Sequence, residues 1–158
     1  GLAAVHFAQL FQGLTWQPSD PDPLAIASIN AWRGDCAVAN VRSAMLLDAS
    51  ADWSIAHADA IVCINMVHIS PWQATLGLFA GAGRLLAAGA PLVLYGPYIE
   101  DGVPTSPGNL AFDESLRNTH PEWGIRRLSD VAHEARQVGL HLRERHAMPA
   151  NNRCIVCP

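Results

Sequence analysis

The sequence predicts an α/β protein with a mostly parallel sheet that is covered by helices on both faces. Helix-like and strand-like segments alternate along the 158 residues. The strand-like segments, such as "AIVCIN" at 60–65 and "PLVLY" at 91–95, are apolar throughout, which is typical of strands buried on both faces. A chain of this length suits one domain with a sizeable core, so we expect residues 1–158 to form a single domain.

The first third of the sequence predicts two helices and two short strands. Residues 3–12 place apolar side chains along one helical face, and Gly13 follows as a stop signal. "LTWQ" at 14–17 predicts a strand that is closed by the turn cluster "PSDPDP". Residues 23–33 predict the second helix and "CAVANVR" at 36–42 a strand, and "LLDAS" follows as a loop.

The clearest helix start follows the buried strand at 60–65. Ser70 suits the N-cap, Pro71 the first helical position and Gln73 the capping-box partner. We expect this helix to run to about Ala88 and to stop at Gly89.

Residues after the strand at 91–95 predict a loop, two helices and a hairpin. The Gly/Pro-rich segment at 96–108 is a long loop of the kind that is often functional. Helices are predicted at 109–118 and 129–138. "LHLRERHAM" and "RCIVC" predict two strands joined by "PANN", a hairpin that adds one antiparallel strand to the sheet.

Composition disfavours a nucleic-acid or membrane partner. Half of the residues are hydrophobic, the net charge is −4, and the ten basic residues are all arginine. No apolar run reaches the ~18 residues that span a bilayer, and no basic stripe stands out. Arg126 and Arg127 are interpreted as solvated residues before a helix. A small-molecule partner is expected, and the sequence does not indicate an oligomeric state.

The four cysteines predict neither a metal site nor a redox site. Cys154 and Cys157 form a C-x-x-C in a strand-like run, whereas redox motifs of that spacing start a helix. On a strand this spacing points the two sulfur atoms to opposite faces. We therefore expect packing cysteines in a reduced state, as in a cytoplasmic protein.

Seven segments in order carry a family resemblance: "AVHFA", "TWQPSDPD", "NMVHISPW", "LYGPY", "NLAFDESLR", "PEWGIR" and "MPANN". This order resembles the class I S-adenosylmethionine-dependent methyltransferases, which have a seven-stranded Rossmann-like fold. More narrowly, it resembles a methyltransferase-like family that is named as a domain of unknown function. The resemblance covers almost the whole chain. It implies S-adenosylmethionine as cofactor and methyl transfer to an acceptor that it does not identify.

The resemblance also implies a missing first strand. The family begins with a strand that ends in a G-x-G loop, and Gly1 corresponds to the last glycine of that loop. We therefore expect a fragment in which Gly1 would approach the methionine part of the cofactor. The missing strand would lie between "LTWQ" and "AIVCIN", so these two segments should either leave a gap or pair directly.

Three further residues are candidate cofactor ligands, because ligands of open α/β sheets bind outside the carboxyl ends of the strands. Asp20 ends the second strand of the family and would accept hydrogen bonds from the ribose; the alternative is a helix N-cap, for which Asp22 is better placed. Asp48 resembles the acid that contacts the adenine amino group; the alternative is a solvated turn. Asn65 would line the pocket, or would only satisfy backbone groups at the turn.

Two candidate catalytic residues follow the central strands. His68 would act as a general base, or would be a polar plug that is hydrogen-bonded to backbone. Tyr95 would orient a nucleophile through its hydroxyl group. Tyr98 would wall the acceptor pocket with its ring, and we expect these three residues to converge with Asn65 on one crevice.

The remaining candidate substrate-binding residues are Trp72, Asn109 and Arg117. For Trp72, packing in the first turn of its helix is favoured over a role as a platform for a ligand. Asn109 follows the long loop and would close over the site. Arg117 would clamp an anionic substrate group, although an ion pair with Asp113 at i,i+4 spacing is favoured.

The mechanism implied by the resemblance is direct displacement at the sulfonium methyl group, for which the protein mainly positions the nucleophile. Two rival functions stay open. One is a nucleotide-dependent oxidoreductase, which a complete G-x-G-x-x-G loop would favour. The other is a methyltransferase-like protein that binds the cofactor or a partner without turnover, because no conspicuous catalytic dyad is visible.

Overall fold

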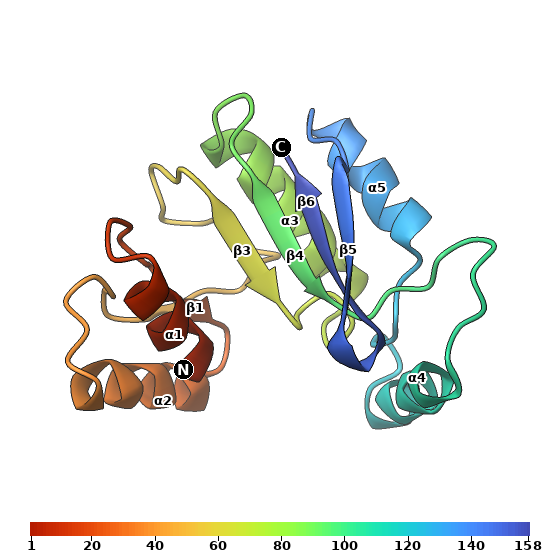
Figure 1. Ribbon diagram of the computed structural model, residues 1–158, viewed down its shortest axis with the longest axis horizontal. Helices are drawn as coiled ribbons and strands as arrows, with labels where there is room; N and C mark the ends of the chain where they lie inside the picture. Colours follow the sequence, from red (N-terminus) through yellow and green to blue (C-terminus); the bar gives the residue numbers. More distant parts are fainter. The chain divides into compact units, whose positions relative to one another are not determined.

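The computed structural model describes all residues 1–158 as two compact units, which are treated separately below. Unit 1 comprises Gly1–Trp53 and unit 2 comprises Ser54–Pro158. Figure 1 shows the helices and strands of both units.

Unit 1 contains two helices and two short strands that pair in parallel. Its helices are α1 (Leu2–Leu10) and α2 (Pro23–Asp35), and its strands are β1 (Ser19–Asp20) and β2 (Met45–Leu46). The side chain of Asp22 accepts a hydrogen bond of 2.9 Å from the Leu24 N–H and so caps α2. The N-cap role of Asp22 is confirmed, which leaves Asp20 available for another role.

The strands predicted at 14–17 and 36–42 are not formed as continuous strands. Trp16 makes only an isolated parallel bridge to Val41. Pro18 has no N–H to donate, so regular pairing begins only at Ser19. The side chain of Asn40 donates 2.9 Å hydrogen bonds to the carbonyls of Ala8 and Leu14, which holds the 36–42 segment as a turn. The second strand lies later, at β2, whose last residue, Leu46, is the first residue of the predicted loop "LLDAS".

Unit 2 contains a four-stranded mixed sheet in the order β3-β4-β6-β5. Its strands are β3 (Ile61–Ile64), β4 (Leu92–Gly96), β5 (Glu144–Met148) and β6 (Asn152–Cys157). β3 and β4 are parallel, whereas β6 is antiparallel to both β4 and β5. The hairpin therefore adds one antiparallel strand, as the sequence predicts. Its turn, η1 (Pro149–Asn151), has positive φ angles at Ala150 and Asn151.

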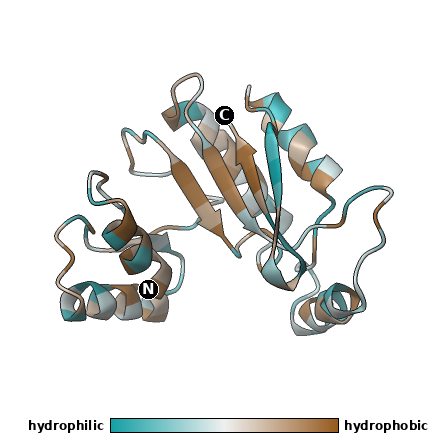
Figure 2. Ribbon diagram, viewed as in Figure 1, coloured by the Kyte–Doolittle hydropathy of each residue, from teal (hydrophilic) through white to brown (hydrophobic).

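The core of unit 2 lies between the apolar strands and the helices. Its helices are α3 (Trp72–Leu85), α4 (Pro107–Thr119) and α5 (Leu128–Gln137). The largest fully buried side chains of unit 2 include Phe79, Leu92, Leu94, Val131 and Ile155. Figure 2 shows β3, β4 and β6 as hydrophobic and β5 as hydrophilic. All five residues of β5 are exposed, and charged side chains on an edge strand discourage pairing with other chains.

The start of α3 differs from the expected one. Pro71 is the N-cap, and the Ser70 hydroxyl instead donates a 2.7 Å hydrogen bond to the carbonyl of Met66. This bond closes the 66–70 turn, and no helix N–H donates to the hydroxyl. The helix ends at Leu85 rather than near Ala88, because Leu86 is already extended.

The 14–17 and 60–65 segments belong to different units. The expectation that they either leave a gap or pair directly therefore stays a prediction. No helix of the structure is long and apolar enough to cross a membrane.

The four cysteines are unpaired. Burial raises the pKa of Cys63 to about 12 and that of Cys157 to about 11, so both thiols stay protonated and unreactive near neutral pH. Cys154 is half-buried and Cys157 is buried on β6. No group of three or more His, Cys, Asp or Glu side chains is arranged to hold a metal ion.

Candidate active site

The carboxyl ends of β3 and β4 place Asn65 beside Tyr95, and the His68 side chain lies against Gly96 at the end of β4. Ile64 is opposite Tyr95 in the parallel ladder, and the Asn65 N–H donates a 2.9 Å hydrogen bond to the Tyr95 carbonyl. Asn65 has a φ of 53°, a left-handed conformation that asparagine adopts more readily than most residues. The chain therefore leaves the sheet sharply at Asn65, and the segment that carries His68 turns over the end of β4.

His68 is buried at this strand end, with 5% of its surface exposed. Its ring meets Phe112 edge-on, with 5.7 Å between ring centroids. A Cβ atom at Gly96 would lie 3.2 Å from His68 Nδ1 and 3.6 Å from Asn65 Oδ1, so glycine is what allows both side chains to press against β4. An alanine at this position would require the imidazole to shift by a few tenths of an ångström.

The protonation state of His68 follows from its surroundings. Burial is the main cause that lowers the pKa of His68 below 6.5, and the nearby Arg126 charge lowers it further. The ring is therefore neutral at pH 7. The contact with Phe112 is an aromatic one, and neither ring nitrogen forms a hydrogen bond within the protein. The imidazole thus keeps a lone pair that can accept a proton.

Arg126 fixes the loop that carries His68. Its guanidinium donates to the carbonyls of Val67 (3.3 Å), Ser70 (2.9 Å) and Glu122 (2.7 Å). It also lies 5.6 Å from the ring centroid of Trp72, a cation–π distance. The interpretation of Arg126 as a solvated residue is wrong, because its side chain is half-buried and bound to backbone on both sides of the loop.

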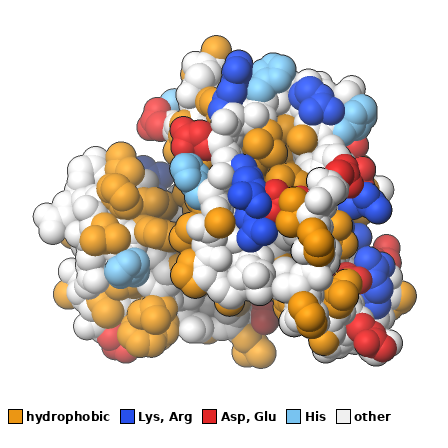
Figure 3. Space-filling model, turned by 45° about the vertical axis from the view of Figure 1, so that its right-hand side comes forward, with side chains coloured by type: hydrophobic (Ala, Val, Ile, Leu, Met, Phe, Trp, Pro, Cys, Tyr) orange, Lys and Arg blue, Asp and Glu red, His pale blue; other side chains and the backbone are white.

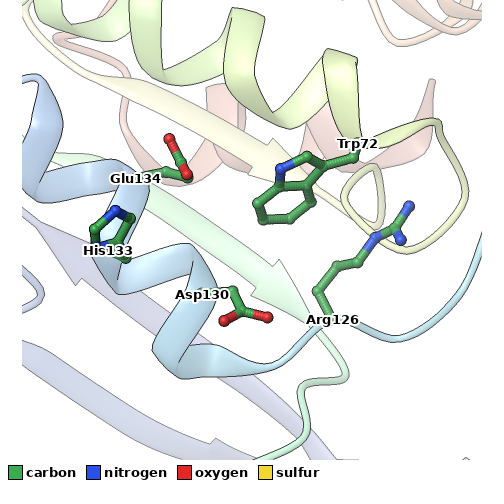
Figure 4. A pocket seen from close by; sticks show the side chains of 5 residues that line it. All are labelled: Trp72, Arg126, Asp130, His133 and Glu134. Atoms are coloured by element: carbon green, nitrogen blue, oxygen red, sulfur yellow. The ribbon is translucent and has the colours of Figure 1, made fainter.

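A cavity of about 270 Å³ lies beside this loop. Trp72, at the start of α3, and Arg126, two residues before α5, line one side of it. The other lining residues, Asp130, His133 and Glu134, are on α5. Figure 4 shows the Trp72 indole projecting toward α5, with Arg126 next to it. Trp72 therefore combines packing on Arg126 with a position in a cavity wall, and its role in substrate binding is not tested.

The loop after β4 covers a second, smaller cavity of about 50 Å³. Tyr98 and Asn109 both line it, and the Asn109 side chain donates to the Asn151 carbonyl at 3.3 Å. Tyr98 is 5% exposed, and burial raises the pKa of its hydroxyl. Tyr98 is therefore a neutral group at any physiological pH.

Glu100 anchors this loop to the β5–β6 hairpin. Its carboxylate accepts two hydrogen bonds from Arg145 (2.7 and 2.6 Å) and one from Arg153 (2.6 Å). These bonds lower the pKa of Glu100, with Arg145 as the main cause. Because the side chain of Glu100 is only 13% exposed, this ion pair is shielded from solvent.

We predict that Glu100→Gln lowers the free energy of unfolding at pH 7 by about 1–3 kcal/mol. The depressed pKa stabilises the folded protein above the ordinary glutamate pKa, and this stability is lost as the pH falls through the lower folded value. Urea denaturation from pH 7 to pH 3 should therefore show a smaller acid loss in Glu100→Gln than in the parent. A Glu114→Gln variant on the exposed part of α4 serves as control, and equal pH profiles for the parent and Glu100→Gln would contradict the prediction.

Arg117 forms the ion pair that its spacing predicts. Its Nε lies 2.9 Å from Asp113 Oδ2, and Asp113 Oδ1 accepts a 2.7 Å hydrogen bond from the Ile125 N–H. Arg117 thus helps to fasten α4 to the segment before α5. Its second predicted role, as a clamp for a substrate anion, is not tested.

In unit 1, Asp20 and Asp48 follow the ends of two neighbouring parallel strands. Asp20 is opposite Leu46 in the ladder, and its Oδ1 accepts a 2.9 Å hydrogen bond from the Asp22 N–H. Asp48 Oδ1 accepts bonds from the Ser50 N–H (2.8 Å) and hydroxyl (2.6 Å), which lower its pKa. Each carboxylate keeps its second oxygen without a donor from the protein.

Gly1 precedes the first turn of α1, at the N-cap. A Cβ atom at this position would lie 2.6 Å from Trp32 Cδ1 and 3.2 Å from the Ser28 carbonyl. Glycine is therefore required where α1 begins against α2. Contact of Gly1 with a cofactor is not tested.

The family model described as "Protein of unknown function (DUF938)" matches residues 1–157. The chain belongs to the DUF938 family. The match runs over both units, so it covers Asp20 and Asp48 in unit 1 as well as Asn65 and Tyr95 in unit 2.

Solved structures show the fold of the DUF938 chain. An O-methyltransferase family protein from Burkholderia thailandensis matches 97% of this chain and 46% of its own, at 13% identity and a TM-score of 0.82. The S-adenosylmethionine-dependent methyltransferase SibL matches 98% and 46%, at 21% identity and 0.79. A protein described as a pericyclic reaction enzyme matches 98% and 39%, at 13% identity and 0.77. The DUF938 chain therefore has the Rossmann-like fold of methyltransferases and spans less than half the length of these proteins.

Two residues of the candidate site, Arg126 and Gly96, have no role that the sequence predicts. Arg126 lies in the segment "PEWGIR" and Gly96 in "LYGPY". A lone arginine before a helix gives no signal of the carbonyls it binds far along the chain. A Gly-Pro pair predicts a turn, but it does not reveal that an imidazole packs on it.

Proposed function

We propose that this protein transfers a methyl group from S-adenosylmethionine to a small-molecule acceptor, with His68 as general base. The observation that carries this proposal is the buried, neutral imidazole whose ring nitrogens have no partner at the carboxyl ends of two parallel strands. Ligands of open α/β sheets bind at that edge. A neutral imidazole at that edge can accept a proton from a ligand bound there.

The residues of unit 1 fit the nucleoside part of the cofactor. Asp20 and Asp48 each keep one carboxylate oxygen without a protein donor, and carboxylates accept hydrogen bonds from ribose hydroxyls and amino groups. The backbone of Gly1 would contact the methionine part of the cofactor, and Asn65 would offer its amide. When bound, S-adenosylmethionine supplies an activated methyl group.

The residues of unit 2 hold the acceptor and manage its proton. Tyr95 would orient the nucleophilic atom through its hydroxyl, and Tyr98 and Asn109, which line the small cavity under the loop after β4, would contact the acceptor from that side. As the nucleophile forms its bond to the methyl carbon, its proton moves to a ring nitrogen of His68, which is neutral and able to receive it. Arg126 keeps the His68 loop in place, so proximity accounts for much of the rate.

A second candidate is cofactor binding that serves chemistry other than methyl transfer. The similarity to a protein described as a pericyclic reaction enzyme supports this alternative, because it connects the same fold with another reaction. Incubation with methyl-labelled S-adenosylmethionine and a panel of metabolites separates the two. Transfer of label supports methyl transfer, whereas cofactor binding without transfer to any acceptor supports the alternative.

The four unpaired cysteines favour a reducing compartment such as the cytoplasm.

We predict that Asp20→Ala weakens S-adenosylmethionine binding by about 1–3 kcal/mol, through the loss of charge-assisted hydrogen bonds. Isothermal titration calorimetry measures this change. Ser19→Ala is the matched control, since successive strand residues point to opposite faces. Unchanged affinity in Asp20→Ala would reject the ribose-binding role.

A further inference from the structure

We infer that the acceptor is an uncharged aromatic compound whose hydroxyl group reacts, a phenol, and that Phe112 recognises its ring. The identity of the reaction rests on the proposed methyl transfer. The recognition of the ring rests on the charges and apolar side chains around His68, and it can be measured without turnover.

Every arginine at the crevice end of unit 2 is already bound to an acceptor of the protein. Arg126 donates to three backbone carbonyls. The others form ion pairs: Arg117 with Asp113, Arg127 with Asp101, and Arg145 and Arg153 with Glu100. An acceptor with a carboxylate or phosphate would therefore find no uncommitted cation, and a buried anion without a partner is costly.

The remaining arginines of unit 2 lie at the other end of the sheet. Arg84 and Arg136 are in the last turns of α3 and α5, helices that start after the carboxyl ends of the strands. The backbone N–H of Arg143 donates to the Val156 carbonyl. Val156 is next to Cys157, which is paired with Leu92, the first residue of β4. Arg143 therefore lies near the amino end of β4. On the face drawn in Figure 3, basic and acidic side chains are interspersed with hydrophobic ones, without a large patch of one sign.

The acids near His68 are occupied in the same way. Glu100, Asp101 and Asp113 each have an arginine partner. Asp130 and Glu134 line the cavity between α3 and α5 instead. Asp113, the acid that follows Phe112 in the chain, is therefore not free to bind an ammonium group of the acceptor.

The side chains that surround His68 favour an aromatic ring. Phe112 keeps 41% of its surface exposed although its ring meets the buried imidazole edge-on. Ile69, the next residue along the chain from His68, is 40% exposed. Apolar side chains next to one polar group are typical of a small-molecule site, and a second ring can pack on the exposed part of Phe112 by offset stacking.

A hydroxyl on that ring matches the one polar group offered. A phenol loses its proton at a pKa near 10, as tyrosine does, far more readily than an aliphatic alcohol. In the reaction, the phenolic oxygen forms a bond to the methyl carbon while the carbon–sulfur bond breaks and its electron pair stays on sulfur. The phenolic proton goes to His68, which returns it to water. A neutral His68 is suited to this transfer, and no other reactant is needed.

The test uses three phenols that differ only in the charge of one substituent: 4-ethylphenol, 4-hydroxyphenylacetate and tyramine. Their binding to the full chain is measured by equilibrium dialysis in the presence of S-adenosylhomocysteine, so that no turnover occurs. We expect 4-ethylphenol to bind about tenfold or more tightly than either charged analogue, because each of these would bring an unpaired charge to the site. Equal or tighter binding of a charged analogue, or no binding of any of the three, overturns the inference.

Two variants place the bound ring. Phe112→Ala should weaken 4-ethylphenol binding about tenfold, the loss of one aromatic contact with its buried area. Leu110→Ala is the matched control, since Leu110 is 57% exposed on the same helix and has no ring to stack. An unchanged affinity in Phe112→Ala overturns the role of Phe112.

A parallel assay with methyl-labelled S-adenosylmethionine separates this inference from the proposed function. Binding of 4-ethylphenol without methylation of any acceptor overturns the proposed function and leaves the ring site standing. Methylation of 4-hydroxyphenylacetate in preference to 4-ethylphenol supports methyl transfer and overturns the inference.

Discussion

Phe79→Ala is expected to lower the free energy of unfolding of unit 2 by about 3–5 kcal/mol, the usual cost of an aromatic-to-alanine change in a core. Phe79 is 2% exposed on α3 and is among the largest fully buried side chains. Its removal loses transfer free energy and leaves a cavity that the surrounding side chains fill only in part. Urea denaturation followed by tryptophan fluorescence measures the change in midpoint and slope.

The neighbouring residue provides the control for this prediction. Ala80 is exposed on the same helix, so Ala80→Ser should cost no more than about 0.5 kcal/mol, the difference in helix propensity. If Phe79→Ala unfolded at the same urea concentration as Ala80→Ser, the packing of α3 described above would be wrong.

His68→Ala is expected to lower kcat by about 10²–10⁴-fold, the usual contribution of a general base. The affinity for S-adenosylmethionine should not change, because the imidazole acts on the acceptor. Single-turnover transfer of a labelled methyl group gives the rate, and calorimetry gives the affinity. His133→Ala, a change of the same type in the α5 cavity, should keep the parent rate.

The pH dependence gives a second check on His68. Because burial lowers the pKa of His68 below 6.5, the base is already neutral at pH 7, and the rate should fall only as the pH drops through that lower value. In His68→Ala this acid limb should vanish. A full rate in His68→Ala would leave the imidazole as a structural plug against Gly96.

The parts of the fold that the sequence could predict are those with local causes. "AIVCIN" and "PLVLY" are apolar without alternation, and they form the parallel pair β3 and β4. Asp22 before Pro23 predicts a helix start, and its carboxylate caps α2. The i,i+4 spacing of Asp113 and Arg117 predicts their ion pair.

The parts that it could not predict depend on partners far along the chain. Residues 36–42 are apolar enough for a strand, but the Asn40 side chain bonds to the carbonyls of Ala8 and Leu14 and holds them as a turn. Ser70 has the right neighbours for an N-cap, yet its hydroxyl donates a hydrogen bond to the Met66 carbonyl and accepts none from the helix. In the site, the packing of His68 on Gly96 is a tertiary contact with no signature in local spacing.

The strand order β3-β4-β6-β5 also has a consequence for how the protein is made. During synthesis on the ribosome, β5 emerges before β6, yet β5 bonds only to β6 and has no place beside β4 until β6 has inserted. β5 therefore joins the sheet only together with β6, from which the three residues of η1 separate it. The exposed side chains of β5, among them Glu144 and Arg145, help to keep this hairpin soluble until β6 docks on β4.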